Sequence, residues 1–337
     1  MDNYDVTIIG AGPIGLFAAF EAGMHNLNCV VIENLSFVGG QCSALYPEKP
    51  IYDIPGFPNI TAQNLIGQLK EQAAPFNPKY LLGQQVTQIK KDSNYWLVNT
   101  SKDTTIKSKT IIIAAGGGAF GPNKPPIPEL EKYENKSVFY TVVKKDALKG
   151  KTIVIAGGGD SAVDWAILLS EIAKKVYVVH RREKFKALPE NVKKLKEIAA
   201  NGNLELIIPY QLHSLKGKNG YLNTVIVSDL NNNIKELETD VLLPFFGLSM
   251  ELGYIKDFGV EIESRHIKVT QSTMQTNLPG VFAIGDICCY PGKLKLILTG
   301  FAEAALACDS ICKYINPDKV MHFEYSTTKG IPIKNAK

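Results

Sequence analysis

The chain has 337 residues, of which 45% are hydrophobic and 21% charged, and it carries a formal net charge of +4. These values are ordinary for a globular protein of about two domains. The lysines are scattered, which argues against a nucleic-acid partner, and the mild positive charge suits an acidic protein partner. Without a leader peptide or an apolar run of about 18 residues, we expect a cytoplasmic protein with no membrane segment.

The first third of the chain contains buried strands and a helix. Residues 6–9 form an apolar run closed by Gly10, apolar residues follow at helical spacing over 14–25, and 30–32 is a second apolar run. Short continuous runs of this kind are typical of buried parallel strands, so the chain begins with a βαβ unit. Residues 111–115 predict another buried strand.

The same strand–glycine–helix pattern starts again in the middle of the chain. Before it, the glycine-rich segment 116–122 predicts a loop, and 244–247 is a second candidate crossing between domains. Between these two crossings, the sequence predicts a helix at 163–173 and strands at 152–156, 176–179, 204–208, 222–229 and 241–243. After the second crossing, it predicts a strand at 281–284 and a helix at 300–315.

The first glycine motif is Gly10-Ala11-Gly12-Pro13-Ile14-Gly15. Gly10 permits a tight turn, Gly12 lets a pyrophosphate approach the backbone, and Gly15 lets helix and strand pack closely. The next strand ends in Glu33, about 20 residues on, where an acid binds ribose hydroxyls. The motif predicts a dinucleotide site; the alternative is a plain glycine turn with Glu33 as a solvated strand end.

Three further features lie where a flat ligand would reach. Gly39 and Gly40 would let the chain pass close to a large planar group, or form an ordinary loop. Tyr46 and Tyr52 would stack on a ring, or pack half-buried. Asp286 ends a late strand, where it would accept a hydrogen bond from a ribityl hydroxyl, or stabilise a turn.

The second glycine motif has Gly157, Gly159 and then Ala162, a residue that the fingerprint tolerates at its third position. Asp160 and Ser161 open the following helix, where their side chains can cap exposed amides, and both are candidate NADP-binding residues.

The strand after this helix ends in basic residues instead of an acid. Arg181 and Arg182 stand at the position that Glu33 takes in the first motif. Guanidinium groups suit a 2′-phosphate, and His180 and Lys186 would add to the same pocket, so we predict NADP at this site. The alternative is a solvated charged turn.

Together these features resemble the thioredoxin-reductase-like class of bacterial ferredoxin/flavodoxin–NADP reductases. The resemblance covers nearly the whole chain, and its most specific stretches are 39–49, 157–166, 180–185 and 283–288. It implies an α/β fold of the pyridine nucleotide-disulfide oxidoreductase type with two Rossmann-like domains. Residues 1–118 and 248–337 would form a discontinuous FAD domain, into which an NADP domain of residues 119–247 is inserted.

The resemblance also implies which residues contact FAD, with Tyr46 stacking on the isoalloxazine ring. These are Glu33, Gln41, Tyr46, Val86, Phe120, Asp286 and Thr327. The class is homodimeric, and its C-terminal tail covers the other face of the flavin. There this chain has Tyr325 before Ser326-Thr327, where the class can have histidine, a difference that bears on the flavin potential.

The six cysteines do not form the pairs found in thiol-reducing relatives. One type has Cys-x4-Cys after the glycine pair, but here Pro47 follows Cys42 five residues later; the other has Cys-x-x-Cys before the second glycine motif, but residues 134–150 contain no cysteine. A dithiol relay needs two thiols within reach. We expect reduced thiols and no metal site.

The implied activity is electron transfer between NADPH and ferredoxin or flavodoxin through noncovalent FAD. The flavin carries the chemistry, so no catalytic side chain is expected. Because the two nucleotides bind separate domains, hydride transfer would need a rotation about 116–122 and 244–249. The alternatives are a thioredoxin-type disulfide reductase, an NADPH diaphorase or oxidase, and a non-catalytic NADP(H)-sensing flavoprotein.

Overall fold

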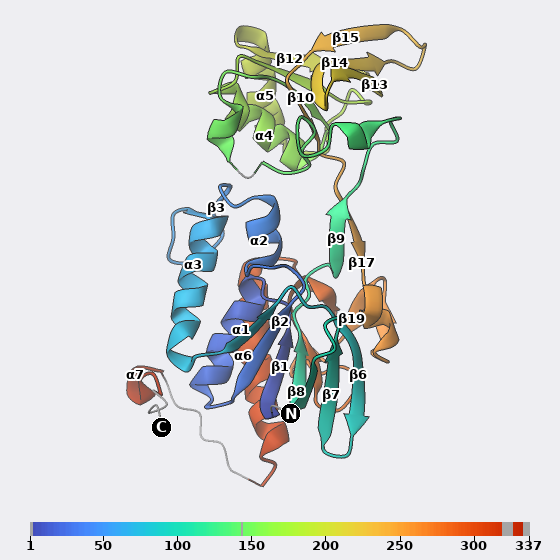
Figure 1. Cartoon of the computed structure of the whole chain (residues 1–337). Helices are drawn as coiled ribbons and strands as arrows, with labels where there is room; N and C mark the ends of the chain where they lie inside the picture. The colour runs from blue at the N-terminus through green and yellow to red at the C-terminus, as the bar shows by residue number, and fades with distance from the viewer. Residues whose placement is uncertain (1–2, 143, 319–325, 333–337) are drawn as a thin grey trace. The chain divides into compact units, whose positions relative to one another are not determined.

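The computed structural model describes residues 3–142, 144–318 and 326–332. The chain forms two compact units, Met1–Ala119 with Met250–Lys337, and Phe120–Ser249 (Figure 1). The segments that cross between them, β9 (Ala119–Pro122) and β17 (Leu248–Glu251), pair as strands. The loop expected over 116–122 is therefore wrong for its second half, because pairing with a second strand overrides weak local strand propensity.

The first unit is built on a seven-stranded sheet. Its path runs β5-β2-β1-β8-β7-β6, and β20 also pairs with β8. The parallel strands are β1 (Asn3–Ile9), β2 (Cys29–Glu33), β5 (Lys79–Leu82), β8 (Thr105–Ile113) and β20 (Val281–Ala283). The remaining two, β6 (Val86–Asp92) and β7 (Tyr95–Thr100), run antiparallel.

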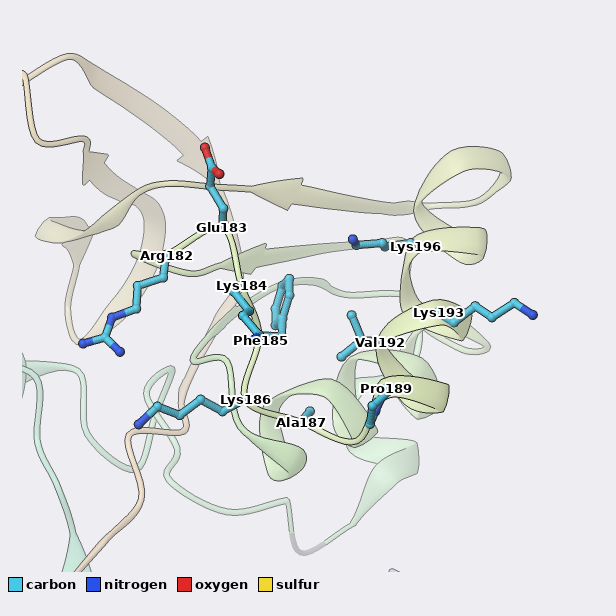
Figure 2. A pocket seen from close by; sticks show the side chains of 10 residues that line it. All are labelled: Arg182, Glu183, Lys184, Phe185, Lys186, Ala187, Pro189, Val192, Lys193 and Lys196. Carbon is cyan, nitrogen blue, oxygen red and sulfur yellow. The ribbon is translucent and has the colours of Figure 1, made fainter.

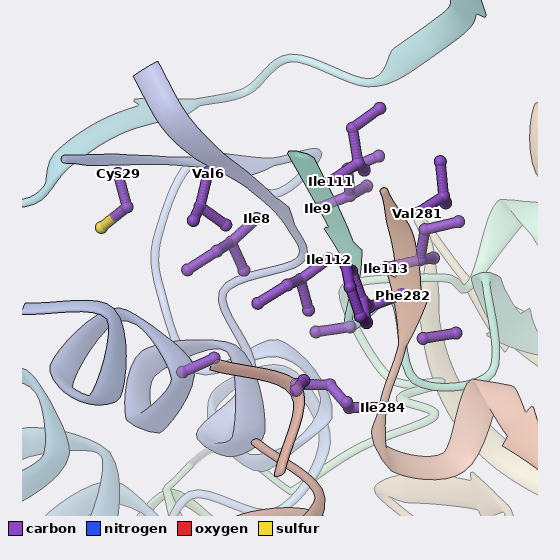
Figure 3. Packing of buried hydrophobic residues seen from close by; sticks show 14 of the residues in the cluster. Val6, Ile8, Ile9, Cys29, Ile111, Ile112, Ile113, Val281, Phe282 and Ile284 are labelled. Carbon is purple, nitrogen blue, oxygen red and sulfur yellow. The ribbon is translucent and has the colours of Figure 1, made fainter. Parts of the chain in front are cut away.

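The centre of this sheet is apolar on both faces. The side chains of β1, β8 and β20 pack together, and Ile8, Ile112 and Phe282 are fully buried (Figure 3). Helices α1 (Pro13–Met24) and α6 (Ile297–Ile315) belong to the same core. Burial on both faces explains why these strands are continuous apolar runs in the sequence.

A smaller apolar cluster lies beside this core. It is formed by α2 (Gly40–Leu45), β3 (Pro50–Ile51), β4 (Ile60–Thr61) and α3 (Ala62–Ala73). Helix α3 buries residues at helical spacing, Leu65, Ile66 and Leu69, and Thr61 caps it by accepting a hydrogen bond from the Asn64 amide.

The second unit has a four-stranded parallel sheet in the order β12-β11-β10-β16. Its elements are β10 (Thr152–Ala156), α4 (Asp160–Ser170), β11 (Lys175–Val179), α5 (Pro189–Asn201), β12 (Leu204–Ile207) and β16 (Val241–Pro244). An antiparallel meander follows β12 in the chain and comprises β13 (Gln211–Lys218), β14 (Tyr221–Ser228) and β15 (Ile234–Glu238). The predicted restart of the strand–glycine–helix pattern is confirmed.

The rest of the first unit consists of short elements. They are the strands β18 (Ile262–Glu263), β19 (His266–Lys268) and β21 (Cys288–Cys289), the one-turn 3₁₀ helix Gly285–Ile287, and the short helix α7 (Ser326–Lys329). Within the described ranges, no helix combines the length and the apolar composition needed to cross a bilayer.

Candidate nucleotide-binding sites

The first glycine turn joins β1 to α1. A Cβ at Gly10 would overlap the Ala114 carbonyl oxygen, and one at Gly15 would overlap the Gly10 carbonyl oxygen, so the fold itself requires both glycines. Gly12 differs, because apart from Gly12 itself and its chain neighbours no heavy atom lies within 4 Å of the position a Cβ would take there. It is also the N-cap of α1, and no side chain caps that helix end. The helix amides therefore face open space, which suits an anion.

Glu33 is tied to this turn. It ends β2 with 8% of its surface exposed, its Oε2 accepts a hydrogen bond from the Ala11 amide at 2.8 Å, and its Oε1 accepts one from the Leu35 amide at 2.9 Å. The solvated strand-end alternative is thus wrong. A carboxylate has about four lone-pair positions, so two acceptor positions remain for ribose hydroxyls.

The second glycine pair lies against the first turn. The Gly39 amide donates to the Ala11 carbonyl at 2.8 Å, and a Cβ at Gly40 would lie 3.2 Å from the Gly12 Cα. Both residues have positive φ, and Gly39 is the N-cap of α2. The ordinary-loop alternative is wrong here, because Gly40 begins a helix. Gln41 follows on this helix, half-buried, with its side-chain amide near Gly116.

Helix α2 and the Asp286 turn are brought together in space. The Tyr46 hydroxyl lies 3.5 Å from the Cys42 Sγ. Burial raises the pKa of both groups, and the Asp286 carboxylate raises each further, although the hydrogen bond from Tyr46 lowers the pKa of the thiol. Cys42 is therefore a neutral thiol at neutral pH, whereas reactive cysteines have lowered pKa values. Tyr52, in contrast, is 71% exposed, so its packing alternative is wrong.

The other FAD candidates lie in different parts of the first unit and on the crossing strand β9. Val86 is buried at the start of β6, and two residues before it the Gln84 amide donates to the Glu33 carbonyl at 3.0 Å. Phe120 lies on strand β9. Thr327 is exposed on α7, whereas Tyr325 lies outside the described residues. The structure thus brings Val86 near Glu33.

The second glycine turn repeats the geometry of the first. A Cβ at Gly157 would lie 2.6 Å from the Phe245 carbonyl oxygen, and one at Gly158 would overlap the His180 ring. At Gly159, the N-cap of α4, nothing lies within 4 Å. As at Gly12, the open space lies where the helix amides emerge.

The predicted capping by Asp160 and Ser161 is wrong, because no side chain caps α4. Asp160 Oδ1 instead accepts a hydrogen bond from the Leu188 amide at 2.9 Å, and Ser161 is exposed. The segment that follows β11 folds back over α4 and takes the carboxylate. The amides at the start of α4 consequently keep no side-chain partner of their own.

The basic segment is anchored to the same turn. The Lys186 amide donates to the Gly158 carbonyl at 2.7 Å, and the His180 ring lies 5.1 Å from that of Phe185. Arg181 and Arg182 are exposed on this fixed segment. A groove of about 1160 Å³ opens beside it, and Figure 2 shows Arg182 and Lys186 extending toward the same side.

His180 is a neutral member of this cluster. Burial lowers its pKa first, and the charges of Arg181, Arg182 and Lys186 lower it further, although a hydrogen bond with the Lys184 carbonyl opposes them. Its expected contribution to a phosphate pocket is therefore shape and hydrogen bonding more than charge.

Residues 4–304 match the model of the pyridine nucleotide-disulphide oxidoreductase family. The chain belongs to this family. Among its relatives, the ferredoxin–NADP reductases of Rickettsia akari and Rickettsia canadensis are each 57% identical over 98% of both chains. The crystal structure of T. acidophilum thioredoxin reductase is similar with 26% identity and a TM-score of 0.79, covering 95% of this chain and 100% of that one. The predicted fold class and the resemblance are confirmed.

The cysteines of this family member form no disulfide. All six are free thiols, and Cys42 contacts Tyr46 instead of a second sulfur. In the described part of the chain, no group of three or more His, Cys, Asp or Glu side chains is arranged to hold a metal ion. The geometry therefore shows two glycine turns with room for a ligand at a helix N-terminus, and six thiols without a disulfide.

Two functional backbone groups were missed from the sequence. Ala11 binds both Glu33 and Gly39, and Gly158 accepts the hydrogen bond that fixes Lys186. Both act through main-chain atoms, so side-chain chemistry gives no signal for them. Gly158, the middle one of three consecutive glycines, is the one available sign, since the fingerprint does not require a glycine there.

Proposed function

We propose that this chain transfers electrons between NADPH and ferredoxin or flavodoxin, with FAD bound by residues 1–118 and 248–337 and NADP by 119–247. One observation carries the proposal: two helix N-termini open onto empty space, and they are flanked by groups of opposite charge. Glu33 belongs to the first, and Arg181 and Arg182 to the second. An acid suits free ribose hydroxyls, whereas arginines suit a 2′-phosphate.

The residues of the first unit fit FAD. The amides at the start of α1 would bind the pyrophosphate beside Gly12, and Glu33 would accept from the adenosine ribose. Asp286 would accept from the ribityl chain, and Tyr46 with Gln41 would flank the ring system. Val86, Phe120 and Thr327, with Tyr325 before it, would complete the contacts.

The residues of the second unit fit NADP. The amides of α4 at Gly159 would bind its pyrophosphate, while Arg181 and Arg182 would bind the 2′-phosphate in charge-assisted hydrogen bonds. When bound, FAD accepts two electrons from NADPH and passes them on one at a time. The protein orients both nucleotides and needs no side-chain acid or base of its own. Ferredoxin is the partner in the names of the relatives, and its electron-transfer role here is part of this proposal.

The decisive experiment compares electron acceptors. Under anaerobic conditions, NADPH should bleach the flavin of the purified holoprotein and then reduce ferredoxin or flavodoxin in catalytic amounts. Thioredoxin should remain oxidised. Rapid reduction of thioredoxin with no transfer to either carrier would favour a disulfide reductase, and absence of flavin bleaching would favour an NADP(H)-sensing role.

A first prediction concerns Cys42. Because its thiol is neutral and has no second sulfur as a partner, Cys42→Ala should reduce ferredoxin at a kcat within about twofold of the unmodified protein. Flavin content, measured by absorbance, should stay at one FAD per chain, and this ratio serves as the control for folding. Loss of ferredoxin reduction in a fully flavinylated variant would show that a sulfur intermediary is required.

A second prediction concerns assembly. Leu298 and Leu306 on α6 are 44% and 42% exposed, and Leu294 in the loop before α6 is 61% exposed. Exposed apolar side chains on one helix and on the loop before it support a homodimer interface. Light scattering after size exclusion should give twice the 36.9 kDa chain mass, and Leu298→Glu/Leu306→Glu should give the monomer mass with FAD still bound. A monomer at all concentrations would rule out this assembly.

A further inference from the structure

A buried carboxylate lies under the Asp286 turn. Glu303, on α6, has 2% of its side chain exposed, and it forms an ion pair with Lys293, whose side chain is 6% exposed. Lys293 lies in the loop between β21 and α6. Burying two charges costs several kcal/mol for each ion unless geometry and hydrogen bonds compensate, so a pair in this position needs an explanation.

The two carboxylate oxygens have separate partners. Oε2 accepts a hydrogen bond from the Gly285 amide at 2.7 Å, and it lies 3.7 Å from the Cys288 thiol, which also lies 3.2 Å from the Gly285 carbonyl oxygen. Oε1 accepts from the Tyr290 hydroxyl at 2.7 Å and from Lys293. Every acceptor position is thus directed at the segment that contains the Asp286 turn or at the loop that follows it.

The Gly285 contact fixes the backbone direction at the next residue. Gly285 has a φ of +76° and begins the 3₁₀ turn Gly285–Ile287. Asp286 follows it, half-buried, and its carboxylate is close enough to Cys42 and Tyr46 to raise the pKa of both. A change in the Gly285 peptide plane would therefore change where the Asp286 carboxylate lies relative to α2.

We infer that Glu303 is a positioning residue of the flavin site. Its Oε2 holds the Gly285 amide so that Asp286 is oriented toward α2, and Lys293 neutralises the carboxylate without taking that oxygen. This inference rests on the proposed FAD site in the first unit. Glu303 and Lys293 do not touch the ligand in this scheme; they act through the turn.

The test separates the charge of Glu303 from its acceptor oxygen. Glu303→Gln/Lys293→Met removes both charges but keeps a carbonyl oxygen that can accept from Gly285. Glu303→Leu/Lys293→Met removes the charges and the acceptor with a side chain of similar size. Tyr290→Phe is the matched control, because it removes a hydrogen bond from Oε1 and leaves the Gly285 contact intact.

FAD affinity of the apoprotein is measured by fluorescence titration, together with the visible circular dichroism of the bound flavin. The Gln/Met variant and Tyr290→Phe should bind FAD within about threefold of the unmodified protein, whereas the Leu/Met variant should bind about tenfold more weakly and with a changed spectrum. If the Leu/Met variant does not fold, Glu303→Asp is tested in its place. Aspartate keeps the negative charge, but its side chain is one methylene group shorter, so its carboxylate lies farther from the Gly285 amide.

Equal FAD affinity and an identical spectrum for the Leu/Met and Gln/Met variants would overturn the positioning role. A loss of thermal stability shared equally by both apoproteins, without a difference in flavin binding, would also overturn it and leave a purely structural ion pair. These results differ from failure of the proposed function, in which the unmodified protein itself would bind no FAD.

Discussion

Gly12→Ala is expected to abolish FAD retention while leaving the apoprotein folded. Apart from residue 12 itself and its chain neighbours, no heavy atom lies within 4 Å of the added methyl group, and Gly12 has a φ of −68°, which alanine adopts freely. The methyl group would instead occupy the space beside the α1 amides that the pyrophosphate needs. We expect FAD affinity to fall about 100-fold and the apoprotein melting temperature to stay within about 2 °C. Flavin titration and thermal unfolding measure the two quantities.

Gly15→Ala provides the contrasting variant. Its methyl group would overlap the Gly10 carbonyl oxygen, so the substitution should destabilise the apoprotein itself, by about 1–3 kcal/mol or more. Gly159→Ala provides the parallel in the second unit, where the added methyl group again meets open space, and it should weaken NADPH binding with FAD content unchanged. If Gly12→Ala bound FAD normally, the open space at α1 would not be the pyrophosphate site.

The sequence was sufficient for the parts of the fold in which local pattern and burial agree. The apolar runs at 6–9, 152–156 and 176–179 are β1, β10 and β11, because strands buried on both faces must be apolar throughout. The strand expected at 111–115 is longer in the structure and starts at Thr105, since its first half pairs with β7 and alternates in burial.

Elements whose signal is spread over polar segments were not found. Helices α3 and α5 are amphipathic and rich in Lys, Glu and Gln, and strands β13 and β15 of the meander are mostly exposed or half-buried, whereas β14 matches the strand predicted at 222–229. Their positions become clear only when the apolar side chains have a core to face. Helical spacing at Leu65, Ile66 and Leu69 was an available sign of α3.

The sequence predicted those features of the candidate sites that follow from residue type. It did not predict the hydrogen bonds between residues distant in the sequence. The glycine motifs and their flanking charges can be read directly. The bond between Glu33 and the Ala11 amide joins residues 22 apart, and Asp160 is engaged by Leu188 instead of capping α4. The donor that each carboxylate binds comes from a segment distant in the sequence. The residues around the carboxylate therefore do not predict it.

Arg181→Ala/Arg182→Ala should remove most of the preference for NADPH over NADH. Both side chains are exposed on a segment that the Lys186 amide fixes to the second glycine turn, so they are free to bind a 2′-phosphate. Each hydrogen bond to a charged group contributes about 1.5–3 kcal/mol, and the variant loses those of both arginines. Because Lys186 would still attract the 2′-phosphate, we expect the KM for NADPH to rise about 100-fold. The KM for NADH should change little, because NADH lacks the phosphate.

Lys174→Ala/Lys194→Ala is the matched control for this variant. It removes the same two positive charges from exposed positions of the second unit, outside the groove beside Arg182. Steady-state rates with both nucleotides should be unchanged in the control at physiological salt, because neither lysine lines the groove and salt screens exposed charges. If the control lost NADPH preference as strongly as the arginine variant, general electrostatic attraction would explain the selectivity. An unchanged NADPH to NADH ratio in the arginine variant would instead move the phosphate site away from the end of β11.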